Sequence, residues 1–164
     1  KVGITAAIKA EVLYGGSLAV ANATVRAIEH MSPEIVTLVA MGLEGQTRSD
    51  EDEQCALYLR NILQGRTPSK DAVRQLITVG EESQKYDDES KPQWPPQDRT
   101  MALSIDSHDF ALKIEKEDGL FVVGGIRLAP IAAAIAIAAI YYALNYGIDT
   151  VESQLKPLIK SMLK

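Results

Sequence analysis

The hydrophobic positions of the first 80 residues alternate between strand-like and helix-like spacing. An apolar run over residues 10–16 ends in two glycines and predicts a buried strand that enters a tight turn. From Ser17 to about residue 31 the apolar side chains follow helical spacing, and Pro33 predicts the end of this helix because it disfavours helical geometry in the residue before it. Residues 35–42 are nearly all apolar, as in a strand buried on both faces. Strand, helix and strand in this order predict a parallel pair with a right-handed crossover.

Two more helices are predicted downstream from the same periodicity. Ser49 and Asp52 have the spacing of a capping box, and Gly65 is a natural helix end. The apolar stripe of this first helix consists of Cys55, Ala56, Leu59, Ile62 and Leu63. The second helix spans roughly residues 69–79, and its inward residues are expected to be Val73, Leu76 and Ile77. These elements make residues 1–80 an α/β half-domain.

The chain then becomes polar before it returns to strand-like patterns. Residues 81–100 are acidic and contain three prolines, so we expect an exposed loop, with Trp94 as an anchor. Residues 101–126 read as strands, and Asp118-Gly119 is a strong hairpin signal. The fold predicted from these patterns is α/β, with a partly parallel sheet flanked by helices and completed by a C-terminal β-hairpin at 101–126.

A segment without charge follows, from residue 128 to residue 148. Its 21 residues would reach about 31 Å as a helix, close to the roughly 30 Å of a bilayer core. We therefore predict a single transmembrane helix over 127–148, followed by an amphipathic basic tail over 149–164. The alternative is a buried Ala/Ile helix of a soluble protein. The predicted membrane-anchor residues are Pro130, Ile135, Ile140, Tyr141 and Tyr142.

Charge and composition narrow the function classes. Residues 1–126 hold 13 Lys and Arg against 20 Asp and Glu, whereas residues 127–164 hold four against two. An acidic body argues against nucleic-acid binding, which needs a cationic face. The single cysteine excludes an internal disulfide, and two distant histidines argue against a His-rich zinc site. The expected partners are a membrane and other subunits of a membrane complex, with no nucleic acid.

Two places carry candidate chemistry. Four acids, residues 50–53, occupy the predicted first turn of a helix, where they either complement the helix dipole or bind a metal. Magnesium needs one or two carboxylates besides waters and phosphate, so Glu51 and Asp52 are its candidate ligands. Gly16 and Ser17 precede another helix and are candidates for phosphate binding, although glycines at such turns also serve close packing. No catalytic residue is assigned.

Three blocks of sequence, residues 12–28, 36–59 and 105–123, resemble the C-terminal half of the 2-phosphosulfolactate phosphatase family. These are magnesium-dependent phosphatases associated with coenzyme M biosynthesis. The most specific block is the family pattern Ser-x-Glu-Asp-x-x-Cys-Ala-Gly, which fits residues 49–56, while Leu57 stands in place of the glycine. The resemblance implies magnesium as the cofactor and supports Glu51 and Asp52 as its ligands.

Two departures from this family shape the functional expectation. The family's N-terminal half, which is expected to bind much of the phosphate, has no counterpart here, and the apolar segment 128–148 is foreign to it. We therefore expect a non-catalytic, phosphatase-derived accessory or scaffolding subunit of a membrane complex, in an organelle of bacterial descent such as a plastid with its thylakoid membrane. The alternatives are a magnesium-dependent phosphatase acting on a small phosphorylated acid such as 2-phosphosulfolactate, and a soluble partner-binding module.

Overall fold

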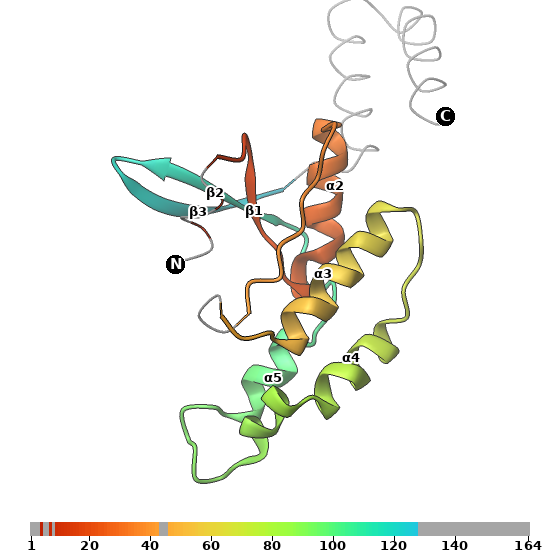
Figure 1. Cartoon of the computed structure of the whole chain (residues 1–164), viewed down its shortest axis with the longest axis vertical. Coiled ribbons are helices and arrows are strands. Elements are labelled where there is room, and N and C mark those ends of the chain that lie inside the picture. Colours follow the sequence, from red (N-terminus) through yellow and green to blue (C-terminus); the bar gives the residue numbers. More distant parts are fainter. Residues whose placement is uncertain (1–3, 5–6, 8, 43–45, 128–164) are drawn as a thin grey trace, which may run out of the picture. The chain divides into compact units, whose positions relative to one another are not determined.

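The computed structural model describes residues 9–42 and 46–127, together with residues 4 and 7 (Figure 1). They belong to one compact unit, residues 1–127. The predicted transmembrane helix over 127–148, apart from Arg127, and the tail over 149–164 lie outside the described residues, as do Pro130, Ile135, Ile140, Tyr141 and Tyr142. Among the helices of the described part, none combines the length and the apolar character needed to cross a bilayer.

Three helices form the main core: α2 (Ala21–Met31), α3 (Asp50–Leu63) and α4 (Lys70–Val79). A short 3-10 helix, η1 (Leu18–Val20), leads into α2, and α3 packs between α2 and α4 (Figure 1). Each helix turns one apolar stripe inward, as the periodicity predicts. The buried cluster consists of Leu18, Ala21, Val25, Tyr58, Leu59, Val73, Ile77 and Ile105.

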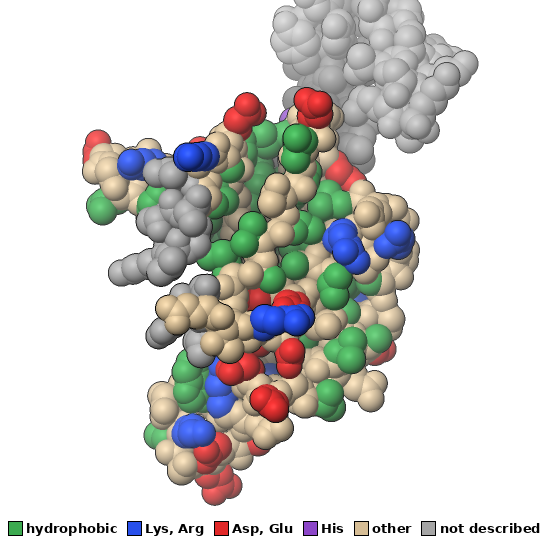
Figure 2. All heavy atoms as spheres, viewed as in Figure 1, with side chains coloured by type: hydrophobic (Ala, Val, Ile, Leu, Met, Phe, Trp, Pro, Cys, Tyr) green, Lys and Arg blue, Asp and Glu red, His purple; other side chains and the backbone are tan. Residues whose placement is uncertain are grey.

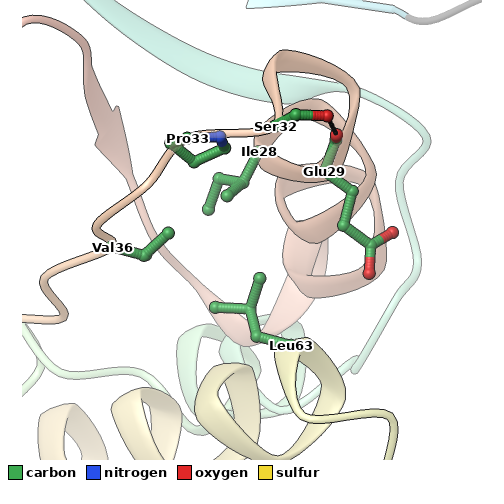
Figure 3. A pocket seen from close by; sticks show the side chains of 6 residues that line it. All are labelled: Ile28, Glu29, Ser32, Pro33, Val36 and Leu63. Carbon is green, nitrogen blue, oxygen red and sulfur yellow. Dashed lines mark hydrogen bonds between the residues drawn. The ribbon is translucent and has the colours of Figure 1, made fainter.

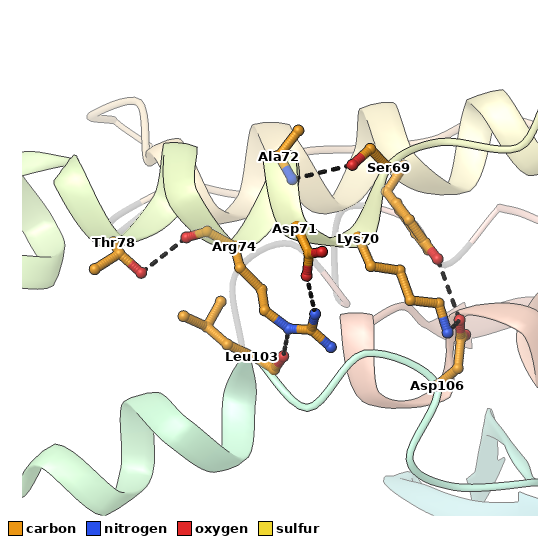
Figure 4. Close-up of polar contacts among 9 residues, drawn as sticks. Ser69, Lys70, Asp71, Ala72, Arg74, Thr78, Leu103 and Asp106 are labelled. Atoms are coloured by element: carbon orange, nitrogen blue, oxygen red, sulfur yellow. Dashed lines mark hydrogen bonds and ion pairs between the residues drawn. The ribbon is translucent and has the colours of Figure 1, made fainter.

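The helix ends follow local signals in the sequence. The helix α2 stops at Ser32, which takes the left-handed conformation directly before Pro33. Past the end of α3, Gly65 has a φ of 71°, a conformation that favours glycine. At the start of α4, the Ser69 hydroxyl accepts a hydrogen bond from the Ala72 N–H at 3.3 Å (Figure 4). The predicted capping box of α3 is wrong, because the Ser49 side chain is buried and makes no capping hydrogen bond.

The polar region 81–100 is more ordered than the predicted loop. It contains the 3-10 helix η2 (Glu81–Asp87), and the helix α5 (Pro96–Ala102) begins inside it. Pro96 occupies the first turn of α5, where a missing N–H costs nothing. Arg99 on α5 reaches back to the Asp87 carboxylate at 2.7 and 2.5 Å. Trp94 lies edge-on to Tyr86 at 6.0 Å between ring centroids, so this tryptophan anchors the region as expected.

Three strands form one antiparallel sheet: β1 (Leu13–Gly15), β2 (Ala111–Glu117) and β3 (Leu120–Ile126), in the order β1-β2-β3. Leu13 pairs with Ile114, and Lys113 pairs with Gly124. The hairpin between β2 and β3 turns at Asp118 and Gly119, which both have positive φ, as a tight two-residue turn requires. The predicted hairpin is thus confirmed, although the preceding residues 101–110 form the end of α5 and turns rather than a strand.

The predicted partly parallel sheet is wrong. Residues 35–42 form no strand, and β1, whose partner they were expected to be, pairs antiparallel with β2 instead. Ile35 and Val39 are 79% and 62% exposed, so this run is not a buried strand. The apolar pattern indicates a preference for burial, but it does not determine which strand would pair with this run. The strand β1 has only three residues with which another strand could pair.

Candidate metal and phosphate site

The acidic turn, residues 50–53, forms the first turn of α3, and one of its carboxylates fixes the chain before it. Asp52 Oδ2 accepts a hydrogen bond from the Gly42 N–H at 2.7 Å. Gly42 has a φ of 64°, and a Cβ there would lie 2.1 Å from the Thr47 carbonyl oxygen, so only glycine fits. Asp52 therefore ties the end of the 35–42 run to α3.

Two other members of the acidic turn also have structural neighbours. Both carboxylate oxygens of Glu53 accept from the Arg48 guanidinium, at 2.5 and 2.6 Å, and this contact lowers the pKa of Glu53. Asp50 Oδ2 lies 2.8 Å from the position of a Cβ at Gly80, so Asp50 packs against the end of α4.

Glu51 is half-buried and has no hydrogen bond or ion pair with the residues that the structure describes. Within residues 9–42 and 46–127, no group of three or more His, Cys, Asp and Glu side chains has an arrangement that could hold a metal ion. Of the two predicted magnesium ligands, Asp52 thus has a structural hydrogen bond, and Glu51 has none among the described residues.

The predicted phosphate seat lies against another part of α3. A Cβ at Gly16 would come 3.0 Å from Leu59 Cδ1, so the glycine permits close packing, which is the steric interpretation of this turn. Ser17 precedes the three-residue η1 and makes no capping hydrogen bond. Gly16 therefore meets α3 about two turns beyond Asp52, and no hydrogen bond among the described residues joins Ser17 to the acidic turn.

The Asp106 carboxylate is a polar centre of the fold, which means here that it accepts contacts from three helices. Its φ is 58°, and its side chain is only 10% exposed. Its Oδ1 accepts from the Asn22 N–H at the start of α2 at 2.8 Å, and its Oδ2 accepts from the Tyr58 hydroxyl at 3.1 Å and from Lys70 Nζ at 2.7 Å. Figure 4 shows the last of these contacts beside α4. One carboxylate thus connects α2, α3 and α4.

The sequence patterns alone place Asp106 among outward polar residues of a strand and miss this role. The local signal that was available is the turn-rich composition of residues 104–109, because aspartate tolerates positive φ. The three hydrogen-bond partners could not be found in the same way, since they lie up to 84 residues away in the sequence.

The pKa values of two neighbouring groups fit a structural role. Burial, and after it the Asp106 charge, raises the pKa of Tyr58 to about 12. Burial, and after it the Asp52 charge, raises the pKa of the Cys55 thiol to about 11. Both groups are therefore protonated at neutral pH, and Cys55 is a packed thiol rather than a nucleophile.

His108 lies on the surface next to Ser107, whose Oγ is 2.9 Å from His108 Nδ1. The neighbouring carboxylate of Asp109 forms an ion pair with Arg26 on α2 instead. Asp106, His108 and Asp109 lie close together in the sequence, but each has different contact residues. They therefore do not form one acid–base group.

A hollow of about 440 Å³ lies where the chain leaves α2 (Figure 3). Its wall is mainly apolar, and the Ser32 hydroxyl on its rim donates to the Glu29 carbonyl at 3.1 Å. The lining residues are Ile28, Glu29, Ser32, Pro33, Val36 and Leu63. One of them, Val36, belongs to the exposed apolar run after Pro33.

No family model, no curated protein and no solved structure matches this chain. The resemblance to the 2-phosphosulfolactate phosphatase family therefore stays a prediction from the motif at residues 49–56.

Proposed function

We propose that this protein is a non-catalytic, phosphatase-derived accessory or scaffolding subunit of a membrane complex, and that it binds a partner subunit through its apolar segment, residues 35–41. The observation that carries this proposal is the exposure of that segment. Four of its seven side chains, Ile35, Val36, Val39 and Met41, are at least 39% exposed. Continuous apolar surface of this kind marks protein-binding sites.

The backbone of the apolar segment supports the same proposal. None of its N–H or C=O groups is hydrogen-bonded within the part of the chain that the structure describes. Figure 2 shows hydrophobic side chains on the face along which this segment runs in Figure 1. Backbone groups that have no partner among the described residues, beside apolar side chains, fit the pairing that a partner's strand or loop offers.

The acidic turn supports a non-catalytic role. Asp52 accepts from Gly42, and Glu53 accepts from Arg48, so two of the four carboxylates serve local structure. A magnesium-dependent phosphatase needs its carboxylates to hold a cation beside phosphate-binding donors.

The membrane part of the proposal rests on the composition of residues 128–148, which hold no charge. Residence in a plastid thylakoid rests on the family resemblance. Washing isolated membranes with carbonate is the direct measurement. We expect the protein to stay with the membrane fraction, and its release would contradict membrane residence.

The partner-binding function is tested with the full chain in its native membrane extract. We expect the wild type to migrate in a complex on native gels, and the double substitution Ile35→Asp and Val39→Asp to release it. Leu76→Asp is the matched control, because Leu76 is also exposed, at 52%, but lies on α4. Magnesium-dependent release of phosphate from 2-phosphosulfolactate that is lost in Glu51→Gln would overturn the proposal in favour of the enzyme.

A further inference from the structure

The edge strand β3 exposes apolar side chains and lacks charged residues. The strand β3 lies at the end of the order β1-β2-β3, and no second strand of the described chain pairs with its other edge. Its seven residues, LFVVGGI, contain no charge and no proline. Leu120, Val122 and Val123 are 71%, 40% and 55% exposed. Edge strands usually carry charges or prolines that prevent pairing with another chain, and β3 has neither.

The neighbouring strand β2 lies between β1 and β3, so both of its edges are paired. Its Lys113, Glu115 and Glu117 lie on the face that they share with Gly124, Val122 and Leu120 of β3. The other edge strand, β1, is also uncharged but has only three residues, so β3 is the longer uncharged edge of the sheet. Figure 1 shows that this hairpin reaches away from α3, α4 and α5, so these helices do not cover it.

The sequence of β3 is complementary to itself. In an antiparallel pair centred on Val123, two large side chains meet glycines: Phe121 lies opposite Gly125, and Val122 lies opposite Gly124. Leu120 lies opposite Ile126, and Val123 meets its own copy. Residues directly opposite share one face of the sheet, so Val122 and Phe121 of one copy would lie beside Gly124 and Gly125 of the other.

The surroundings of Gly124 fit this pairing. A Cβ at Gly124 would meet nothing within 4 Å, so there is open space for the Val122 side chain of a second copy, whereas a Cβ at Gly125 would lie 3.4 Å from Phe110 Cδ2 of the same chain. No charge lies opposite a like charge anywhere in the pair, because residues 120–126 are uncharged.

We propose that two copies of this protein form a two-fold symmetric dimer by antiparallel pairing of their β3 strands, which joins the two three-stranded sheets into one. The occupant of the β3 edge is thus a second copy, and the pairing is isologous, with Val123 on the axis. This inference does not depend on the proposed function, because β3 and the apolar segment 35–41 are separate surfaces.

Cysteine cross-linking of the full chain in membranes or mild detergent tests the register directly, in a Cys55→Ser background that removes the native thiol. We expect Val123→Cys to form a disulfide-linked dimer on mild oxidation, because paired residues have Cβ atoms about 4.5–5.5 Å apart. Leu120→Cys is the matched control. It is also exposed but would lie six residues from its own copy, roughly 20 Å away, and we expect no cross-link. Leu120→Cys combined with Ile126→Cys should restore cross-linking.

A second measurement uses charge in place of a disulfide. Val123→Lys puts two ammonium groups face to face on the axis, and we expect the dimer dissociation constant in sedimentation experiments to rise on the order of tenfold or more. Leu76→Lys, which is also exposed but lies on α4 outside the sheet, should leave it unchanged. Since residues 1–126 carry a net charge of −7, the two bodies repel each other, and added salt should strengthen the dimer.

Three results would overturn the inference: a monomer under all conditions, equal cross-linking of Val123→Cys and Leu120→Cys, or a cross-link from Val123→Cys to a different protein only. Failure of the proposed partner binding is distinguishable, because Ile35→Asp with Val39→Asp should not change the Val123→Cys cross-link.

Discussion

The helical part and the strand part of this protein differ in how fully they bury their apolar side chains. In the helices, Ala21 and Val25 are 0% and 2% exposed, and α2, α3 and α4 cover one another's stripes. In the strand part, no residue of β3 is buried, and the apolar segment 35–41 lies open. A helix satisfies its own backbone hydrogen bonds and needs one covered stripe, whereas a strand needs neighbours at both edges and often on both faces. Among the described residues, the helical part therefore covers its own apolar stripes, and the extended part leaves apolar side chains exposed.

The largest expected effect is in the helical core. Leu59→Ala should lower the free energy of unfolding by about 3 kcal/mol, because Leu59 is buried between the helices and meets Gly16. Leu57→Ala, on the same helix but exposed, should cost about 1 kcal/mol or less. Urea denaturation followed by circular dichroism measures both. Equal costs would mean that the helical part is not the stable core.

A smaller effect is expected at the polar centre. Tyr58→Phe removes a hydrogen bond to Asp106 and should cost about 1 kcal/mol at pH 7. Below pH 10 the phenol of the wild type is protonated in both the folded and the unfolded chain. Between pH 10 and about 12 the unfolded chain loses this proton while the folded chain keeps it, so wild-type stability falls.

The phenylalanine variant lacks this titration. The difference between the two proteins should therefore shrink as the pH rises through this window, and then reverse in sign. Denaturation at pH 7, 9.5 and 11.5 measures it. A difference that stays constant with pH would show that Tyr58 is not held protonated by burial and by Asp106.

The smallest effect on stability is expected in the strand part. Ile35→Thr with Val39→Thr should change the free energy of unfolding by no more than about 0.5 kcal/mol per site, because both side chains face solvent. The same variant should bind less of a hydrophobic fluorescent dye than the wild type. A large loss of stability would mean that the segment is buried in solution, and the contrast between the two parts would disappear.

The helices and the hairpin could be predicted because their signals are local. The periodicity of residues 50–63, the helix end before Pro33 and the turn at Asp118-Gly119 all lie within a few residues of the structure they determine. The inward side of α4 was predicted only in part, since Val73 and Ile77 are buried but Leu76 is exposed. Helical spacing defines a stripe, and the packing partner decides how wide the buried part is.

The pairing of β1 and the candidate site depend on distant residues, and so they could not be predicted. The run 35–42 has the composition of a buried strand, yet the described chain supplies no second layer to bury it. Likewise, the acidic turn shows four carboxylates, but the roles of Asp52 and Glu53 depend on Gly42 and Arg48. The helix α5 was not predicted, because it begins in the polar region 81–100 and its main local signal is the proline in its first turn.

The three contacts of Asp106 affect how the helical part unfolds. Because one carboxylate receives the Asn22 amide, the Tyr58 phenol and the Lys70 ammonium, no helix of the three can detach without leaving this charge short of a donor in a mostly buried place. The helical part is thereby linked into a single cooperative unit of unfolding, although its members come from far-apart stretches of the chain.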